Sequence, residues 1–109
     1  CYVDTPGMRS DPEPAEADAI EISRALAETA DLLLWCQDAT SSRPPLPPTR
    51  AAVLAVDLRS DLGVPLLNPG LSVTSRDERS VDVLARAIRQ SLVPDAALAD
   101  PGAWDFWSP

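Results

Sequence analysis

Residues 2–9 read Tyr-Val-Asp-Thr-Pro-Gly-Met-Arg, an apolar pair followed by an aspartate and then, three positions later, by a glycine. A carboxylate at the end of a buried strand can hold Mg²⁺ through water, and a glycine has no side chain to keep its backbone N–H away from a terminal phosphate. Asp4 and Gly7 have the DxxG spacing that such a site needs. The stretch therefore predicts a strand that ends at Asp4 beside a phosphate, with an ordinary turn after a strand as the alternative.

The segment that follows has the spacing of an amphipathic helix. Asp11 is predicted to cap this helix, with Pro12 in its first turn. An apolar stripe at helical spacing comprises Ala15, Ala19, Ile22, Leu26 and Ala30. We expect this stripe to be the buried face of a helix that packs on one side.

Three apolar runs further along the chain predict strands. Residues 32–36 (LLLWC) form an unbroken apolar run, which is typical of a strand buried on both faces of a parallel sheet. Residues 51–58 resemble a second inner strand, and residues 71–73 a short one after a turn. The connection at 39–50 contains four prolines, so most of it is not expected to be helical.

A last helix is predicted near residue 80. Ser80 is its expected cap, and its apolar face comprises Val81, Leu84, Ile88 and Leu92. The predicted order is strand, helix, strand, linker, strand, strand, helix. That order indicates an α/β fold with a mostly parallel sheet.

The composition argues against two kinds of site. The chain has 109 residues and a net charge of −8, with nine basic residues, all of them arginine, and no histidine. Affinity for nucleic acid comes mostly from clustered Lys and Arg, so we expect no direct nucleic-acid binding by this acidic segment. The phosphate-binding P-loop, GxxxxGK[ST], needs a lysine, so these residues contain no P-loop.

The cysteines and the hydropathy pattern indicate the cellular compartment of the protein. Cys1 and Cys36 lie in apolar runs, where small buried side chains are expected. No apolar run approaches the roughly 20 residues that span a bilayer, so we expect no membrane partner and a cytoplasmic location. Because the chain begins at Cys1, directly in a predicted strand, we expect it to be a fragment of a longer protein.

Residues 4–38 resemble the switch II region, and the helix and strand after it, of the TrmE/MnmE-type tRNA-modification GTPases, within the Era-like group of P-loop GTPases. The matching residues are DTPGMR at 4–9, Glu13 and Glu16, the helix through 25–27, and ADLLL at 30–34. The spacing of twelve residues between Asp4 and Glu16 is the part most particular to this family.

The resemblance assigns roles to residues at the phosphate side. Glu16 corresponds to the glutamate that positions or activates the water attacking the γ-phosphate of GTP, a role that suits a carboxylate. The alternative for Glu16 is a place in the first helical turn, where the helix dipole favours negative charge. Asp4, Thr5, Pro6 and Gly7 correspond to switch II, with Asp4 binding Mg²⁺ through water. The implied cofactors are GTP, Mg²⁺ and K⁺, and the K⁺ ligands belong to a part of the family's domain that this chain does not contain.

Residues 73–84 are similar to the family's V-S-A-K-x-G-x-G segment at the guanine base. In that segment the backbone N–H of the residue aligned with Ser75 holds guanine O6. Thr74 and Arg76 flank Ser75 and are assigned to the same guanine site. A turn that leads into an amphipathic helix is common, so the segment is an ordinary turn in the alternative interpretation.

The guanine-specificity motif [NT]KxD has two candidate registers, residues 58–61 (LRSD) and residues 54–57 (LAVD). We prefer the first, because it keeps a basic residue before the aspartate and places the motif beyond the strand. Asp61 then accepts hydrogen bonds from guanine N1–H and the exocyclic amine, and Arg59 stacks on the base. Leu58 stands at the first position and cannot hydrogen-bond; a surface loop aspartate is the alternative for Asp61.

The resemblance implies a three-layer P-loop NTPase fold, the Ras-like G domain, present as its C-terminal half over residues 1–92. Residues 93–109 are a tail with Trp104, Phe106 and Trp107. In the family's geometry the strand that carries the P-loop lies between the strand ending at Asp4 and the strand at 32–36. We therefore expect both strands to lack a neighbour there, and the chain alone to be poorly folded and catalytically inert.

The implied function is hydrolysis of GTP as a conformational switch in tRNA modification. The ligand is a guanine nucleotide, and a partner protein and tRNA bind through regions outside this chain. Three alternatives stay open. They are a degenerate, non-catalytic G domain that serves as a scaffold, a ribosome-assembly GTPase of the Era or Der type, and an unrelated flavodoxin-like domain.

Overall fold

Three parallel strands form the centre of the molecule in the computed structural model, which describes residues 1–6, 13–41, 44–63, 69–99 and 102. They are β1 (Leu32–Asp38), β2 (Ala52–Leu58) and β3 (Leu71–Val73), in the order β1-β2-β3. Leu32 lies opposite Ala52, and Val56 lies opposite Leu71. The α/β fold with a parallel sheet, predicted from the apolar runs, is confirmed.

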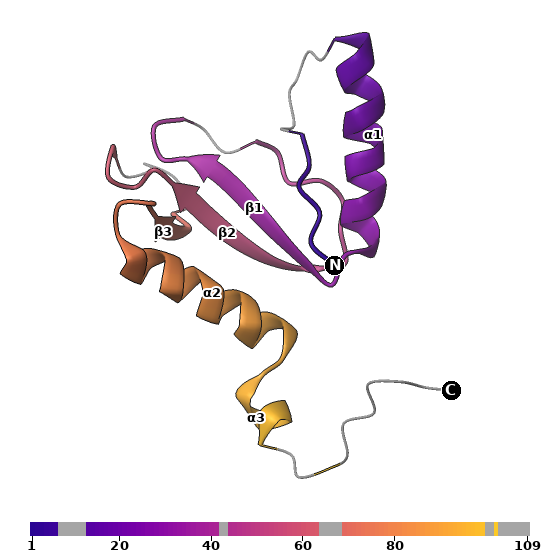
Figure 1. The fold of residues 1–109 in the computed structure, drawn as a ribbon. Coiled ribbons are helices and arrows are strands. Elements are labelled where there is room, and N and C mark those ends of the chain that lie inside the picture. Colours follow the sequence, from indigo (N-terminus) through magenta and orange to yellow (C-terminus); the bar gives the residue numbers. More distant parts are fainter. Residues whose placement is uncertain (7–12, 42–43, 64–68, 100–101, 103–109) are drawn as a thin grey trace.

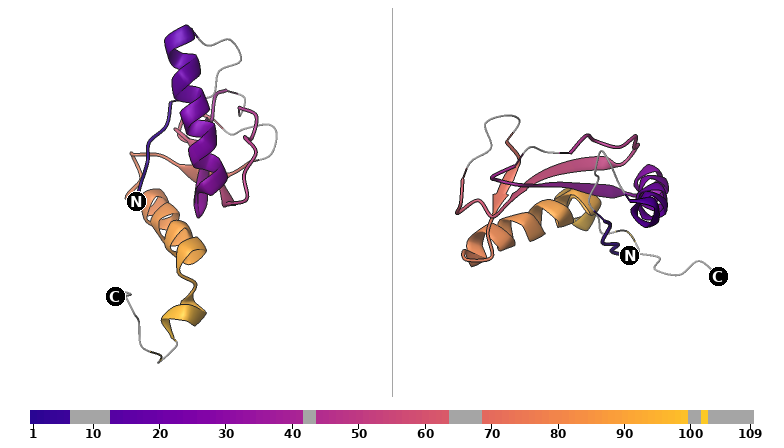
Figure 2. Two further views of the ribbon diagram at one scale, coloured as in Figure 1. Left: turned by 90° about the vertical axis from the view of Figure 1, so that its right-hand side faces the viewer. Right: turned by 90° about the horizontal axis from the view of Figure 1, so that it is seen from above.

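Helices lie on different sides of these strands (Figures 1 and 2). Helix α1 (Pro14–Thr29) precedes β1, and its end lies next to the start of that strand (Figure 1). Helix α2 (Glu78–Leu92) follows β3 and runs along one face of the sheet. The short helix α3 (Asp95–Leu98) comes after α2. Trp104, Phe106 and Trp107 lie outside the described residues.

The predicted strand at Tyr2 and Val3 is wrong. Residues 1–6 have no strand structure, and both of these side chains are exposed. A strand requires a neighbouring backbone to pair with, and each of the three described sheet strands pairs with another of the same three. Residues 2–3 are apolar, as strand residues often are, but they pair with none of these three strands.

Helix α1 begins later than expected and buries another face. Its N-cap is Glu13, with Pro14 in the first turn, whereas the predicted cap, Asp11, lies outside the described residues. The predicted stripe is wrong at Ile22, which is 62% exposed, and Leu26 is exposed as well. The buried residues of α1 are Ile20, Ser23 and Ala27. Ser23 tolerates burial because its hydroxyl donates to the Ala19 carbonyl at 2.7 Å.

Strand β1 is less buried than its unbroken apolar sequence predicted. Residues 32–35 are half-buried and Cys36 is exposed, so the prediction of a strand buried on both faces is wrong. Cys1 is also exposed, because it lies in the N-terminal segment outside the sheet. The expectation that both cysteines are buried is therefore wrong. In the described sheet β1 pairs with β2 alone, so one of its backbone edges is not covered by a strand there.

The cap of α2 also differs from the prediction. The N-cap is Asp77, whose side chain accepts a hydrogen bond from the backbone N–H of Arg79 at 3.1 Å. Ser80 lies inside the helix, and its hydroxyl donates back to the Thr74 carbonyl at 3.0 Å. On the predicted apolar face, Leu84 and Ile88 are half-buried, whereas Val81 and Leu92 are exposed.

The proline-rich connection is not helical in its described part, as expected. Two side-chain hydrogen bonds hold it to the rest of the fold. The Trp35 ring N–H donates to the Pro44 carbonyl at 3.0 Å, and the Thr49 hydroxyl donates to the Ala27 carbonyl at 2.5 Å. The connection is therefore held to β1 at Pro44 and to α1 at Thr49.

A buried polar contact joins all three strands. Asp57 in β2 is 0% exposed. One of its carboxylate oxygens accepts from the side-chain amide of Gln37 in β1 at 2.6 Å, and the other accepts from the Gly70 backbone N–H, just before β3, also at 2.6 Å. Gln37 and Asp57 are register partners in the sheet. This contact fixes the ends of the strands relative to one another.

Replacing Asp57 with alanine is expected to destabilise the fold by about 3 kcal/mol, because the Gln37 amide and the Gly70 N–H would lose their acceptor inside the protein. Thermal or urea unfolding of the full-length protein that carries this sequence measures the change. Asp82→Ala, at an exposed position of α2, is the control and should change the unfolding free energy by no more than about 0.5 kcal/mol. Equal stability of the two variants would show that the buried contact contributes nothing.

Candidate functional site

Polar side chains gather where the three parallel strands end. Asp38 is the last residue of β1, Arg59 and Asp61 follow β2, and Thr74 and Arg76 follow β3. The carboxyl ends of parallel strands lie at the same edge of a sheet, and open α/β sheets bind ligands there. The sheet thus brings together residues that lie up to 38 positions apart in the sequence.

The turn after β2 is pinned on both sides by backbone hydrogen bonds. The Ala39 N–H donates to the Leu58 carbonyl at 2.8 Å, and the Ser60 N–H donates to the Val73 carbonyl at 3.2 Å. Arg59, between these two points, has a φ of 55°, in the left-handed region that non-glycine residues seldom adopt. A bond of 2.9 Å from the Leu62 N–H to the Arg59 carbonyl closes the turn that contains Asp61.

Asp61 is joined to the turn after β3. One carboxylate oxygen accepts from the Thr74 hydroxyl at 2.7 Å, and the other lies 3.2 Å from a guanidinium nitrogen of Arg76. The Thr74 hydrogen bond is the main influence that lowers the pKa of Asp61, and the charges of Arg76 and Arg59 act in the same direction. The carboxyl group is therefore an ionised acceptor at neutral pH. Ser75 is exposed in the same turn.

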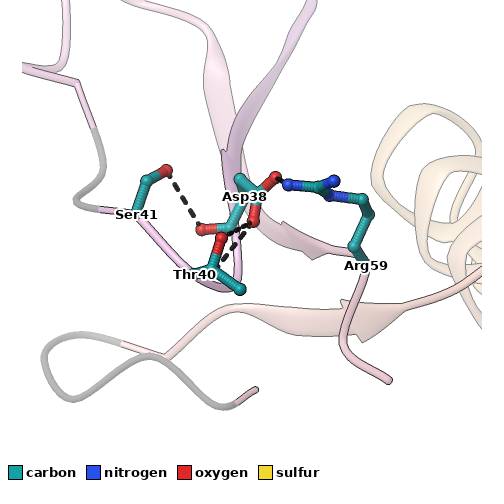
Figure 3. A network of polar contacts seen from close by, with 4 residues as sticks. All are labelled: Asp38, Thr40, Ser41 and Arg59. Carbon is teal, nitrogen blue, oxygen red and sulfur yellow. Dashed lines mark hydrogen bonds and ion pairs between the residues drawn. The ribbon is translucent and has the colours of Figure 1, made fainter. Parts of the chain in front are cut away.

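Asp38 forms a second network at this edge (Figure 3). One carboxylate oxygen accepts from the Thr40 backbone N–H at 2.8 Å and from the Thr40 hydroxyl at 2.6 Å, and the other forms an ion pair with the Arg59 guanidinium. The Thr40 hydroxyl is the largest cause that lowers the pKa of Asp38, followed by the Thr40 backbone N–H, and Arg59 adds to both.

The two registers proposed for the specificity motif place their aspartates in different surroundings. Asp57, the aspartate of residues 54–57, is enclosed and bonded through both oxygens to Gln37 and Gly70. Asp61, the aspartate of residues 58–61, lies in an exposed turn beyond the strand. The Asp61 carboxylate is also bonded through both oxygens, to Thr74 and Arg76, but its side chain is 24% exposed and takes no part in the buried contact that holds the strands.

The residues assigned to the phosphate side do not join this cluster. Asp4, Thr5 and Pro6 are exposed in the N-terminal segment, and Gly7 lies outside the described residues. Glu16 lies in the first turn of α1, and its carboxylate accepts from the Glu13 backbone N–H at 3.3 Å as part of a capping box. Figure 1 places the start of α1 well away from the loops after β2 and β3.

The described residues contain no group of three or more His, Cys, Asp or Glu side chains that could hold a metal ion. Mg²⁺ at nucleotide sites is usually held by one or two carboxylates together with phosphate oxygens and water. Asp4 offers a single exposed carboxylate. It is therefore consistent with a Mg²⁺ site completed by phosphate oxygens and water, and not with a site in which the protein supplies every ligand.

Two residues of the edge cluster, Asp38 and Thr40, were not predicted from the sequence, which places them only at the end of a strand and the start of a linker. The available signal is an Asp-x-Thr sequence directly after an apolar strand, which favours a turn closed by side-chain hydrogen bonds. The partner of Asp38, Arg59, is 21 residues away, so no local pattern indicates the ion pair.

The parallel sheet, its flanking helices and the polar loops at its carboxyl edge define part of an open α/β domain of the kind that binds a ligand at that edge. Within the described ranges no helix combines the length and the apolar character that crossing a bilayer would require.

Comparison with known proteins gives the particular family. Over 93 residues, 84% of its length, the chain is 36% identical to the tRNA modification GTPase MnmE of one strain of Thermus thermophilus. Identity to the protein of the same name from a second strain of that organism is 34% over 93 residues. The chain thus resembles the TrmE/MnmE-type GTPases over most of its length, and its parallel α/β sheet is part of a P-loop G domain of that type. The chain spans about a fifth, 22%, of the length of these curated relatives. No protein-family model matches the chain, and no solved structure matches it significantly.

Proposed function

We propose that this chain supplies the guanine-recognition loops of a GTP-binding site, in a cytoplasmic protein that hydrolyses GTP as a conformational switch in tRNA modification. The observation that carries the proposal is the position of Asp61. Its ionised carboxylate lies at the carboxyl edge of the parallel sheet, beside Thr74 and Arg76 from the next strand's loop. The relatives named above are tRNA modification GTPases, which supports the choice of nucleotide and process.

The base is recognised by complementary hydrogen bonding. Guanine presents N1–H and a 2-amino group on one edge, and the two oxygens of the Asp61 carboxylate accept from both. Adenine presents an acceptor at N1 and no 2-amino group, so it leaves the carboxylate without these bonds. Ser75, in the exposed turn after β3, supplies a backbone N–H for guanine O6.

The phosphate side is formed by switch II and the start of α1. Asp4 would hold Mg²⁺ through water, and Mg²⁺ supplies neutralisation of charge on the phosphates when it is bound. The Gly7 N–H contacts the γ-phosphate, and Glu16 orients the attacking water. A K⁺ ion beside the phosphates would be held by residues outside this chain. Hydrolysis releases the switch segment and changes its contact with a partner protein.

The proposal predicts a strong preference for guanine nucleotides. Fluorescence or calorimetric titration of the full-length protein that carries this sequence, with GDP and then with ADP, should give an affinity for GDP on the order of 100-fold higher, as a bidentate base contact implies. Equal affinities for GDP and ADP would reject guanine recognition by this edge. Binding of neither nucleotide would favour a non-catalytic scaffold.

A further inference from the structure

The residue before the guanine-recognition turn lacks the polar group that the family motif carries. Leu58 stands where the motif has Asn or Thr, and its side chain is 40% exposed and apolar. Leu58 is tied to its surroundings by its backbone carbonyl, which accepts from the Ala39 N–H at 2.8 Å. The Leu58 side chain therefore offers no hydrogen bond to the next residue, Arg59.

Strand β1 provides a polar side-chain partner for Arg59, which is Asp38. The carboxylate is held first by Thr40, whose N–H and hydroxyl both donate to one oxygen, at 2.8 and 2.6 Å. The Asp38 backbone carbonyl is also fixed, since it accepts from the Ser41 N–H at 3.0 Å. Figure 3 shows the second carboxylate oxygen turned toward the Arg59 guanidinium, with which it forms an ion pair. Asp38 is thus already ordered on the side away from Arg59.

Arg59 combines a constrained backbone with an accessible side chain. Its φ of 55° costs free energy in a residue with a Cβ, and the hydrogen bonds at Leu58 and Ser60 hold it in that conformation. Its side chain is 60% exposed, so the guanidinium retains open surface while it is paired with Asp38. A planar guanidinium with an open face can stack on an aromatic ring.

We propose that Asp38 is a positioning residue for guanine binding, which orders the Arg59 guanidinium so that it can stack on the base. This inference rests on the proposed function, because it assumes that guanine binds beside Asp61. Ordering a long side chain before binding removes part of the entropy cost of immobilising it in the complex. Asp38 in β1 thereby supplies Arg59 with a polar side-chain partner, which the apolar Leu58 in β2 cannot be.

The alternative is that the Asp38–Arg59 pair is an ordinary surface ion pair. Such pairs contribute little to stability. Arg89 and Asp95 form a pair of this kind at 2.8 Å, at the far end of α2 from the strand loops, and they serve as a matched control. The two interpretations differ in whether removing the carboxylate changes nucleotide affinity.

The test measures binding of a fluorescent GDP analogue to the full-length protein and to its variants. Asp38→Asn keeps the shape of the side chain but removes its charge, and it should weaken GDP binding by about 3- to 10-fold. Arg59→Ala should weaken binding at least as much. The double variant Asp38→Asn/Arg59→Ala should bind as Arg59→Ala alone does, because Asp38 acts through Arg59. Asp95→Asn should bind GDP as the unmodified protein does.

A charge exchange separates positioning from simple ion-pair stability. Asp38→Arg/Arg59→Asp restores an ion pair but not the hydrogen bonds from Thr40, and so should recover only part of the melting temperature lost in Asp38→Arg. It places a carboxylate where the guanidinium should stack, so GDP affinity should stay low. Recovery of GDP affinity in the exchanged pair, wild-type affinity in Asp38→Asn, or additive losses in the double variant would each overturn the proposal.

The same GDP titrations test the role of Asp38 separately from guanine recognition by Asp61. If Asp61→Asn weakens GDP binding and Asp38→Asn does not, guanine recognition stands and the role of Asp38 is rejected. If neither substitution affects GDP binding, the guanine site itself is rejected, and the role of Asp38 is rejected with it.

Discussion

Replacing Glu16 with alanine is expected to slow GTP hydrolysis about 100-fold or more, with little change in GTP affinity. A group that positions or activates the attacking water acts mainly in the transition state, and general base groups contribute at least about this factor. Its loss lowers kcat and leaves ground-state binding in place. The measurement is single-turnover GTP hydrolysis by the full-length protein, with K⁺ and Mg²⁺ present.

The capping box of α1 makes a second variant necessary. Because the Glu16 carboxylate accepts from the Glu13 N–H, Glu16→Ala also weakens the start of the helix. Glu16→Gln keeps an acceptor for the Glu13 N–H, since glutamine serves equally in a capping box, but it cannot take a proton from water. Equal loss of hydrolysis in both variants would assign the effect to the carboxylate.

The two Glu16 variants can also differ in their rates of GTP hydrolysis. Full activity in Glu16→Gln, with loss only in Glu16→Ala, would show that the carboxylate does not act as a base, and that an amide suffices at this position to hold the helix start or to orient water. Glu21→Gln, at an exposed position of the same helix, is the control for added amide groups and should hydrolyse GTP at the unmodified rate.

Asp61→Asn is expected to exchange the base preference of the binding site. The amide presents one acceptor and one donor where the carboxylate presented two acceptors. Guanine would lose one charge-assisted hydrogen bond and meet a donor opposite its 2-amino group, so GDP affinity should fall on the order of 100-fold. Xanthine carries an oxygen in place of that amino group, and it matches the asparagine amide.

Competition titrations with GDP and XDP measure this exchange. The variant should bind XDP more tightly than GDP, whereas the unmodified protein should do the reverse. Asp82→Asn, on the exposed side of α2, should keep the preference for GDP. A variant that lost affinity for both nucleotides equally would indicate a structural role for Asp61, through its bonds to Thr74 and Arg76.

The three strands and the helix at 78–92 could be predicted because their signals are local. Continuous apolar runs end close to where β1, β2 and β3 end, and a period of 3.6 residues marks the second helix. The edge cluster at Arg59, Asp61 and Thr74 follows from this topology, since parallel strands bring their following loops to one edge.

The wrong predictions concern structure that depends on contacts with distant parts of the chain. Tyr2 and Val3 have strand-like composition, but pairing depends on a backbone elsewhere, and they pair with none of the described strands. In α1 the apolar residues Ile22 and Leu26 form a stripe at helical spacing, yet the face with Ile20 and Ala27 is the buried one. Helical period fixes which residues share a face, and packing fixes which face is covered.

Buried polar contacts were also beyond local inference. Asp57 lies in an apolar run and is the aspartate of one of the two candidate motif registers, whereas its two oxygens are bonded to Gln37 and Gly70. The pairing of Asp38 with Arg59 likewise emerges only when β1 and β2 are aligned in register. Sequence motifs indicated the chemistry of the edge, and tertiary structure determined which carboxylate holds which group.

Guanine recognition at the carboxyl edge can be tested by determining the structure of the full-length protein bound to GDP. The guanine base should lie beside Asp61, with its N1 and 2-amino nitrogens about 2.7–3.2 Å from the carboxylate oxygens and with Arg59 stacked on its ring. A base bound elsewhere, with Asp61 still held by Thr74 and Arg76 alone, would contradict guanine recognition by these loops.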